Sequence, residues 1–217
     1  MKIAICIPCA IKDVQYIERL LYSIEQQTVH PDIVCISISG VTHTIPSYTS
    51  SFKLRIIQTP DQKNAGENRN IAALAVYENV DIISFIDADD YMHPRRTESL
   101  LYVFNNNICD VFLHGYKNVS KTLCKLELEL IAHNIDISGD ILDSLELQPT
   151  NFIHANDGSG HDIPIHNGHI SCKSSIYHIN NVPENAVWYE DSKYTGDLFI
   201  KGYRCRFTPD KLSLYCR

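Results

Sequence analysis

The sequence has 217 residues, of which 44% are hydrophobic and 21% are charged. This balance is that of one globular domain with a substantial core, which excludes a disordered chain. The formal net charge is −7 at pH 7 and runs of Lys or Arg are absent, which argues against nucleic acid or an anionic membrane as the main partner. Charges return at Lys12 and Asp13, too early for a signal sequence or a membrane span.

The first 116 residues alternate between strand-like and helix-like stretches, which is typical of a sheet covered by helices. Apolar runs predict strands over residues 2–8, 33–39, 54–58, 81–86 and 110–116. Three helices are predicted over residues 13–27 with Asp13 as the N-cap, 67–77, and 94–104 with Pro94 in the first turn. We therefore expect an α/β fold.

The second half of the sequence is less regular. Residues 124–130 alternate Leu with Lys and Glu, which favours a half-exposed strand, with a short helix as the alternative. A loop is predicted over residues 156–168, and a helix over 188–201, closed by Gly202. Two short strands, 205–208 and 212–215, are predicted to follow. Because no repeat or linker divides the sequence, we predict a single domain over residues 1–217.

Eight cysteines are scattered along the chain, most of them inside apolar runs. This favours reduced thiols and a cytoplasmic location. Cys6 and Cys9 form a single C-x-x-C, but a zinc site needs a second pair of ligands at similar spacing, and a redox motif opens a helix after a strand. We therefore interpret the pair as ordinary packing residues.

Two carboxylates, Asp87 and Asp89, directly follow the predicted strand 81–86. Open α/β sheets bind ligands at the carboxyl ends of their strands. Hard cations such as Mn²⁺ or Mg²⁺ take oxygen ligands from a few carboxylates and from substrate phosphates. The pattern predicts a metal ion shared with a diphosphate; the alternative is a polar turn after a strand, where Asp is common.

Two further segments could complete such a site. The segment from Asn64 to Asn70 lies at a strand-to-helix junction, where helix N–H groups and the cations Lys63 and Arg69 could meet phosphates; the alternative for each cation is a solvated surface charge. Glu190 and Asp191 begin a later helix and could supply a general base, although acidic residues there also stabilise the helix dipole.

Taken in order, these segments resemble the family 2 glycosyltransferases, whose fold is the GT-A type, a Rossmann-like, mixed and mostly parallel sheet flanked by helices. The resemblance runs through most of the chain. It is carried by residues 5–10 (ICIPCA), 23–28 (SIEQQT), 66–70 (GENRN, like the family's Gly-x-x-x-Asn), 85–90 (FIDADD), 190–191 (ED) and 201–204 (KGYR). It implies a nucleotide-sugar-binding half over residues 1–116 and an acceptor-side, catalytic half over 117–217.

The resemblance also implies roles for individual residues. Asp89 would be the main metal ligand, with Asp87 near the metal or the ribose and Ala88 between them. The nucleotide would lie against Pro8, Cys9 and Ala10. Asp191 would act as the base, beside Glu190, in an inverting transfer of sugar from a nucleotide-diphosphate donor, expected to be a UDP-sugar, to an acceptor hydroxyl on a glycan or glycoprotein. A fainter resemblance links the chain to glycosyltransferase domains encoded by large DNA viruses, which would place it in the host cytoplasm.

The sequence departs from the family at two places. An Asp that reads the base usually follows the second strand, whereas this chain has Ser37-Ile38-Ser39-Gly40; Ser39, or Asp61 and Gln62, could substitute. Some relatives place a His metal ligand shortly after a terminal strand, whereas this sequence ends at Arg217, so we expect it to be one domain of a longer protein. The histidines of the second half offer another source of ligands (His154, His161, His166 and His169).

Three other functions compete with this interpretation. An Asp-nucleophile phosphatase would need an aspartate strand near the N-terminus and Thr at the position of Asp90. A sugar-nucleotide pyrophosphorylase would need a Gly-rich phosphate loop after the first strand, where residues 8–12 contain no Gly. The strongest alternative is a catalytically inactive, transferase-like domain that binds a glycan or a partner, because a fold does not determine activity.

Overall fold

The computed structural model describes residues 1–42, 47–137, 145–146, 154–156, 162–164, 167–184 and 190–217. Within these residues the strands form a nine-stranded sheet in the order β3-β2-β1-β4-β10-β6-β11-β5, with β7 paired to β11, and a two-stranded sheet of β8 and β9. Four neighbouring strands are parallel to one another: β1 (Ile3–Ala10), β2 (Ile33–Ser39), β3 (Lys53–Thr59) and β4 (Ile82–Phe85). All four carboxyl ends therefore lie at one edge of the sheet.

The other half of the large sheet is mixed. Its strands are β10 (Ile170–Lys173), β6 (Val111–Val119), β11 (Cys205–Cys216), β5 (Tyr91–Met92) and β7 (Leu145–Glu146). Because β10 is antiparallel to both β4 and β6, and β11 is parallel to β6, the strands β6 and β11 run in the same direction as β4. The predicted fold class, a mixed and mostly parallel sheet flanked by helices, is confirmed.

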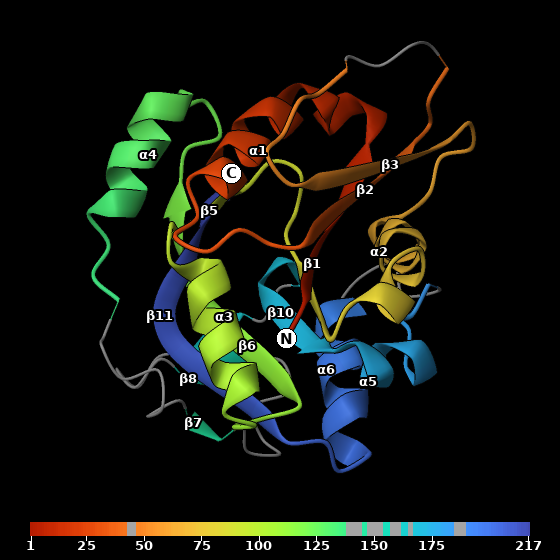
Figure 1. The fold of residues 1–217 in the computed structure, drawn as a ribbon, viewed down its shortest axis with the longest axis vertical. Coiled ribbons are helices and arrows are strands. Elements are labelled where there is room, and N and C mark those ends of the chain that lie inside the picture. Colours follow the sequence, from red (N-terminus) through yellow and green to blue (C-terminus); the bar gives the residue numbers. More distant parts are fainter. Residues whose placement is uncertain (43–46, 138–144, 147–153, 157–161, 165–166, 185–189) are drawn as a thin grey trace.

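Helices cover both faces of this sheet (Figure 1). One face packs against α1 (Ile17–Glu25) and α3 (Arg96–Asn105). The other packs against α2 (Ala65–Leu74), α5 (Ser174–Ile179) and α6 (Glu190–Ile200), which lie to the right of β1 in Figure 1. A separate apolar cluster seats α4 (Lys125–His133) against the end of β11. None of the helices within the described residues is long and apolar enough to cross a bilayer.

The alternation of side chains along β1 shows whether Cys6 and Cys9 of the C-x-x-C pair could bind one metal ion. Residues three apart in a strand point to opposite faces. Cys6 accordingly packs in the core that α2 covers, and Cys9 in the core that α1 and α3 cover. The two thiols therefore cannot share a metal ion. All eight cysteines are free, and burial raises the pKa of Cys9 to about 12, so the interpretation of the pair as packing residues is confirmed.

Helix starts differ from the sequence predictions in three places. Asp13 does not cap α1, because residues 11–16 form a 3₁₀ turn, η1 (Ile11–Tyr16), and α1 begins only at Ile17. Helix α2 begins two residues earlier than predicted, because Asn64 and Glu67 form a reciprocal capping box. Helix α3 begins at Arg96, two residues after Pro94. The first of these corrections matters most, since Asp13 is not a helix cap and its carboxylate can face the cavity described below.

The strand predicted over residues 124–130 is wrong, and the alternative, a short helix, is correct. The Glu127 carboxylate accepts the backbone N–H of Cys124 at 2.8 Å and closes a capping box that starts α4. Alternation of Leu misled the prediction, because Leu128 is buried whereas Leu126 and Leu130 are 63% and 65% exposed. The helix therefore presents an apolar stripe that no described element covers.

Two other elements of the second half also differ from prediction. The two predicted terminal strands are one strand, β11, with register shifts between Thr208 and Ser213. The predicted loop over residues 156–168 contains β9 (Asp162–Pro164), paired with β8 (His154–Asn156), and the start of the 3₁₀ turn η5 (Asn167–His169). Helix α6 begins at Glu190, and the predicted start at 188–189 lies outside the described residues. Gly202 closes it at φ +84°, as predicted.

Candidate active site

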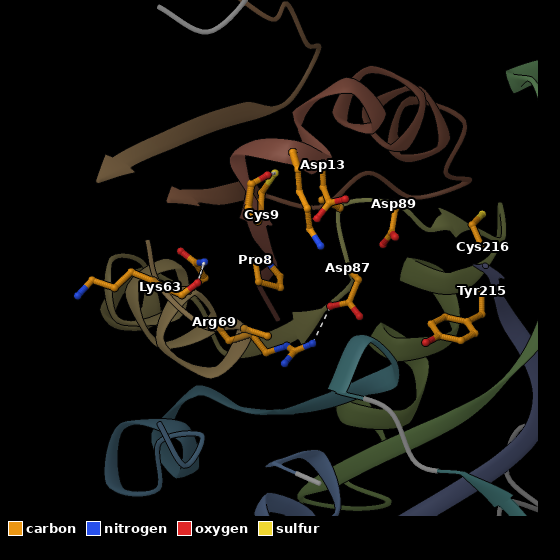
Figure 2. Close-up of a pocket in the computed structure, with 14 residues that line it drawn as sticks. Pro8, Cys9, Asp13, Lys63, Arg69, Asp87, Asp89, Tyr215 and Cys216 are labelled. Atoms are coloured by element: carbon orange, nitrogen blue, oxygen red, sulfur yellow. Dashed lines mark hydrogen bonds and ion pairs between the residues drawn. The ribbon is translucent and has the colours of Figure 1, made fainter. Parts of the chain in front are cut away.

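A cavity of about 310 Å³ opens at the edge of the sheet where β1 and β4 end (Figure 2). Eight of the ten binding residues predicted from the sequence line it: Pro8, Cys9, Ala10, Lys63, Arg69, Asp87, Ala88 and Asp89. Ser39 and Asn64 are not among its lining residues. The cavity is therefore formed where the open sheet of an α/β protein is expected to bind a ligand.

Asp87 is held by an ion pair with α2. The Arg69 guanidinium donates from Nη2 to Asp87 Oδ1 at 2.7 Å, the dashed contact in Figure 2. The Arg69 side chain is only 4% exposed and that of Asp87 is 28% exposed. On the other side, Gly168 brings η5 so close that a Cβ there would lie 3.3 Å from the Asp87 backbone nitrogen. Asp87 is thus fixed from two sides.

Asp89 is paired with a lysine that the sequence did not single out. Lys121, in the segment between β6 and α4, donates its ammonium to Asp89 Oδ2 and lies 3.8 Å from Asp13 Oδ1. Arg19 of α1 donates to the backbone oxygens of Asp89, at 2.6 Å, and of Lys121, at 2.9 Å. Burial, followed by the charge of Asp89, raises the pKa of Asp13. Three carboxylates therefore face one region of the cavity, and basic side chains neutralise two of them.

The turn that carries both aspartates is anchored by buried polar side chains. Buried Asp90 accepts the backbone N–H of Cys216 at 3.0 Å, which ties the turn to the end of β11. Burial, with the charge of Asp87, raises the Asp90 pKa well above its usual range. Arg96, also buried, donates to Ser213 at 2.8 Å, to Ser84 at 3.0 Å and to the backbone oxygen of Phe85. These contacts fix the end of β4, and no local sequence signal pointed to them.

Ser39 belongs to a buried network rather than to the cavity surface. It is 1% exposed, and its hydroxyl accepts from Asn68 Nδ2 at 2.9 Å, while Ser37 donates to Asn68 Oδ1 at 2.9 Å. Asn68 itself lines the cavity. Asp61 and Gln62 are exposed and are not among the lining residues. The structure therefore brings none of the three residues suggested for base reading into the cavity, and Ser39 can act there only through Asn68.

The Gly-x-x-x-Asn segment of α2 docks the chain that leads to α6. Asn70 donates to the Val182 backbone oxygen at 3.0 Å and to Glu184 Oε1 at 2.8 Å, and accepts from the Val182 N–H at 3.0 Å. Asn64 donates to the Glu184 backbone oxygen at 2.8 Å. A Cβ at Gly66 would meet the backbone oxygen of Pro183 at 3.1 Å, so this residue must be small. The segment therefore positions the path to α6 as well as the cavity wall.

The predicted catalytic residues, Glu190 and Asp191, are the first two residues of α6. Their side chains lie outside the described part of the structure, so their distance to the cavity stays a prediction. Two of the four histidines named as candidate ligands, His161 and His166, also lie outside the described residues, as does the side chain of His154. His169 is buried, stacks on Tyr116 at 4.6 Å between ring centroids, and is not a lining residue.

Sequence reasoning missed several residues of the site. Lys12, Asp13, Asn68, Tyr215 and Cys216 line the cavity without having been predicted to do so. The last two reach it because β11 runs parallel to β6 and so ends at the same edge as β4. Such long-range pairing leaves no local pattern. Asp13 carried a visible signal, a carboxylate just after the first strand, but helical spacing made it look like a cap.

The aspartates fit a divalent cation of the Mn²⁺ or Mg²⁺ type. Asp87 and Asp89 offer hard oxygen ligands to one cavity. Within the described residues no three His, Cys, Asp or Glu side chains are grouped as a metal site, and Asp87 and Asp89 are the two carboxylates predicted as ligands. Cations of this type usually keep waters and bind substrate phosphates in addition to one or two carboxylates. The donor set is therefore that of a cation shared with a phosphorylated ligand.

Fold and site together define the class of protein. Residues 4–160, which are 157 of the 217 residues, match the sequence profile of Glycosyl transferase family 2. The chain therefore belongs to Glycosyl transferase family 2, and the GT-A fold expected from the resemblance is confirmed. A search of curated proteins found no significant match.

Solved structures of S. aureus TarS share this fold. TarS 1–349 in complex with UDP-GlcNAc matches 100% of this chain with a TM-score of 0.71 and 17% sequence identity, over 59% of its own length. TarS 1–349 in complex with UDP matches 100% of this chain at 0.64 and 15%, over 61%. The chain thus spans about three fifths of these structures. The comparisons give no support to the viral likeness.

Proposed function

We propose that this protein is a nucleotide-sugar glycosyltransferase that uses a UDP-sugar and a divalent cation. The observation that carries the proposal is the cavity at the ends of β1 and β4, where Asp87 and Asp89 lie with Lys63 and Arg69. Membership of Glycosyl transferase family 2 supports the reaction class. The complexes of TarS with UDP-GlcNAc and UDP, which share the fold, support UDP as the nucleotide.

In this proposal Asp87 and Asp89 hold a Mn²⁺ or Mg²⁺ ion. When bound, such an ion acts as a Lewis acid that stabilises negative charge on a departing nucleotide diphosphate. Lys63 lies at the cavity wall, where its side chain is 32% exposed and pairs with Glu67 at 3.5 Å. In Figure 2 this side chain points away from the two aspartates, so its ammonium would have to turn toward the cavity to meet a phosphate. Pro8, Cys9 and Ala10 provide the surface against which the nucleotide lies.

We propose Asp191 as the general base, beside Glu190, in an inverting displacement at the anomeric carbon. A base in this role takes the proton of the acceptor hydroxyl as that oxygen attacks. Support comes from the docking of residues 182–184 by Asn64 and Asn70, because these contacts hold the path to α6 next to the cavity wall. The acceptor is proposed to be a hydroxyl of a glycan or glycoprotein.

A nucleotide-binding experiment tests the proposal. Thermal unfolding is measured with UDP, GDP and CDP, each with and without Mn²⁺. We expect UDP with Mn²⁺ to raise the unfolding temperature most, because the ligand that binds the folded state most tightly stabilises it most at equal concentration. Asp89→Asn should remove the Mn²⁺-dependent part of the rise. Stabilisation by none of the nucleotides would contradict the proposal.

Turnover separates the proposal from its alternative, a transferase-like domain that binds but does not react. Hydrolysis of UDP-GlcNAc, followed as release of UDP in the presence of Mn²⁺, is expected for a transferase given water in place of its acceptor. UDP binding without UDP release from any UDP-sugar would favour the binding domain. If Asp191→Asn released UDP as fast as the wild type, its assignment as base would be wrong.

A further inference from the structure

We propose that the Lys121 ammonium is a built-in counter-ion of Asp89 that a divalent cation must displace, so that the cation and the donor diphosphate bind cooperatively. The inference deepens the proposed function of this cavity and rests on it. The observation behind it is that a basic side chain of the protein already pairs with the Asp89 carboxylate that we propose as a metal ligand.

The ammonium of Lys121 lies between groups that attract a cation. It donates to Asp89 Oδ2, lies 3.8 Å from Asp13 Oδ1, and sits 4.7 Å from the centre of the Tyr16 ring. Two carboxylates and an aromatic face therefore surround one positive charge. Burial works against that charge, but the hydrogen bond to Asp89 and the charges of both aspartates raise the Lys121 pKa.

The backbone that carries this lysine is fixed independently of its side chain. The Lys121 N–H donates to the Arg217 backbone oxygen at 2.7 Å, and its backbone oxygen accepts from Arg19 at 2.9 Å. Arg19 also donates to the backbone oxygen of Asp89 at 2.6 Å. The segment and the aspartate turn are thus held by the same guanidinium. An exchange of ions at Asp89 requires only the lysine stem to rotate.

The ammonium is free to leave because it is only partly enclosed. The Lys121 side chain is 31% exposed and that of Asp89 is 24% exposed, so water can reach both partners during an exchange. A lysine offers one charge on a flexible stem, whereas a divalent cation offers two charges and several coordination positions. A divalent cation can therefore outcompete Lys121 at Asp89, but it must overcome the existing ion pair.

Displacement leaves the ammonium beside the cavity with only the more distant carboxylate of Asp13, 3.8 Å away, as a partner. A diphosphate bound there supplies new negative oxygens within reach of a lysine anchored at this position. The diphosphate therefore stabilises the state in which Lys121 has left Asp89, which is the state that binds the metal. Coupling of this kind is reciprocal, so the metal must strengthen diphosphate binding by the same factor.

The experiment measures Mn²⁺ binding directly, from the electron paramagnetic resonance signal of free Mn²⁺, with and without UDP. In wild type we expect weak binding of Mn²⁺ alone and a clear strengthening by UDP. In Lys121→Met, Mn²⁺ alone should bind about tenfold more tightly, and the strengthening by UDP should shrink by a similar factor. Lys121→Arg keeps the positive charge and should keep binding of Mn²⁺ alone weak.

Lys125→Met is the matched control. This lysine is four residues away, is exposed, and places its ammonium over the Tyr22 ring rather than on an aspartate. The variant loses the same charge from the same region and should bind Mn²⁺ as the wild type does. If it tightened Mn²⁺ binding as much as Lys121→Met, the effect would be one of general charge, and the inference would be overturned.

Asp89→Asn separates this inference from the proposed function. If Mn²⁺ binding requires Asp89 but is unchanged or weakened in Lys121→Met, the counter-ion role is wrong and the metal site stands. If neither the wild type nor Lys121→Met binds Mn²⁺ with UDP present, both the counter-ion role and the metal site are overturned. Unfolding temperatures without metal confirm that each variant is folded before binding is compared.

Discussion

The two walls of the cavity hold their carboxylates in different ways. On the α2 wall, Asp87 is paired with Arg69, whose guanidinium is 4% exposed. On the opposite wall, Asp89 is paired with Lys121, which is 31% exposed. The partner of Asp87 comes from a capped helix that also docks residues 182–184, whereas the partner of Asp89 comes from a short segment between β6 and α4, behind the residues that line the cavity.

This difference separates a structural carboxylate from an exchangeable one. A nearly buried partner that is removed leaves a charge without compensation, which costs much more than the loss of an exposed ion pair. Asp87 is therefore expected to keep its protein partner when ligands bind, and Asp89 to change it.

The largest effect is expected at Asp89. Asp89→Asn removes the carboxylate that we propose as the main metal ligand, and sugar transfer should fall at least about a hundredfold. Asp87→Asn should cost less, since an amide oxygen can still accept from Arg69. UDP release from UDP-GlcNAc at saturating Mn²⁺ measures both variants. A greater loss in Asp87→Asn would reverse our assignment of the two aspartates.

The next largest effect concerns the docking role of the α2 wall. Asn70→Ala removes an acceptor of the Val182 N–H and of the Tyr177 hydroxyl and the donor to the Val182 backbone oxygen, and these groups are buried. We expect a loss of about 3 kcal/mol in the free energy of unfolding. Urea unfolding measures it. Asn118→Ala, at an exposed position on β6, should be nearly neutral.

Substitution of the two basic side chains, Arg69 and Lys121, compares the walls directly. Arg69→Met should lower the free energy of unfolding by about 2 kcal/mol, because Asp87 is left partly buried and unpaired. Lys121→Met should cost about 0.5 kcal/mol, as expected of a partly exposed ion pair. Chemical unfolding without metal or nucleotide gives both values. Equal losses would show that the walls do not differ in the way we infer.

Much of the α2 side of the molecule could be predicted from the sequence because its signals are local. Strand β2 lies at its predicted bounds, since a run of apolar residues needs no partner to be recognised. Asp87 and Asp89 were placed at the edge of the sheet because they follow another apolar run, the strand β4. Eight of the ten predicted binding residues line the cavity for this reason.

The opposite wall could not be predicted because its contacts join distant parts of the chain. Lys121 meets Asp89 across 32 residues, and Cys216 meets Asp90 across 126. Neither contact leaves a periodic pattern. The helix α4 did carry a local signal, the Cys124 and Glu127 capping box, but Cys is an unusual cap and the alternation of Leu hid it. In the correctly predicted helix α2, the sequence did not indicate that Asn64 and Asn70 bind residues 182–184.

The smallest effect on the cavity is expected from a substitution at the opposite edge of the sheet, where an ion pair should affect neither wall. Asp110 precedes β6 and accepts from Arg204, at 3.0 Å, and from Lys173, at 2.7 Å. Burial acts in the other direction, but these partners hold the Asp110 pKa well below its usual range. The stabilisation is therefore complete above the ordinary Asp pKa and is lost as the pH falls through the lower, folded-state value.

Asp110→Asn is accordingly expected to lower the free energy of unfolding by about 1 kcal/mol at pH 7. The difference from wild type should shrink as the pH falls below about 4, because the unfolded chain then takes up the proton that the folded chain resists. Urea unfolding between pH 7 and pH 3 measures this. Stabilisation by UDP with Mn²⁺ should be unchanged, and a reduced response would show that the two edges of the sheet are coupled.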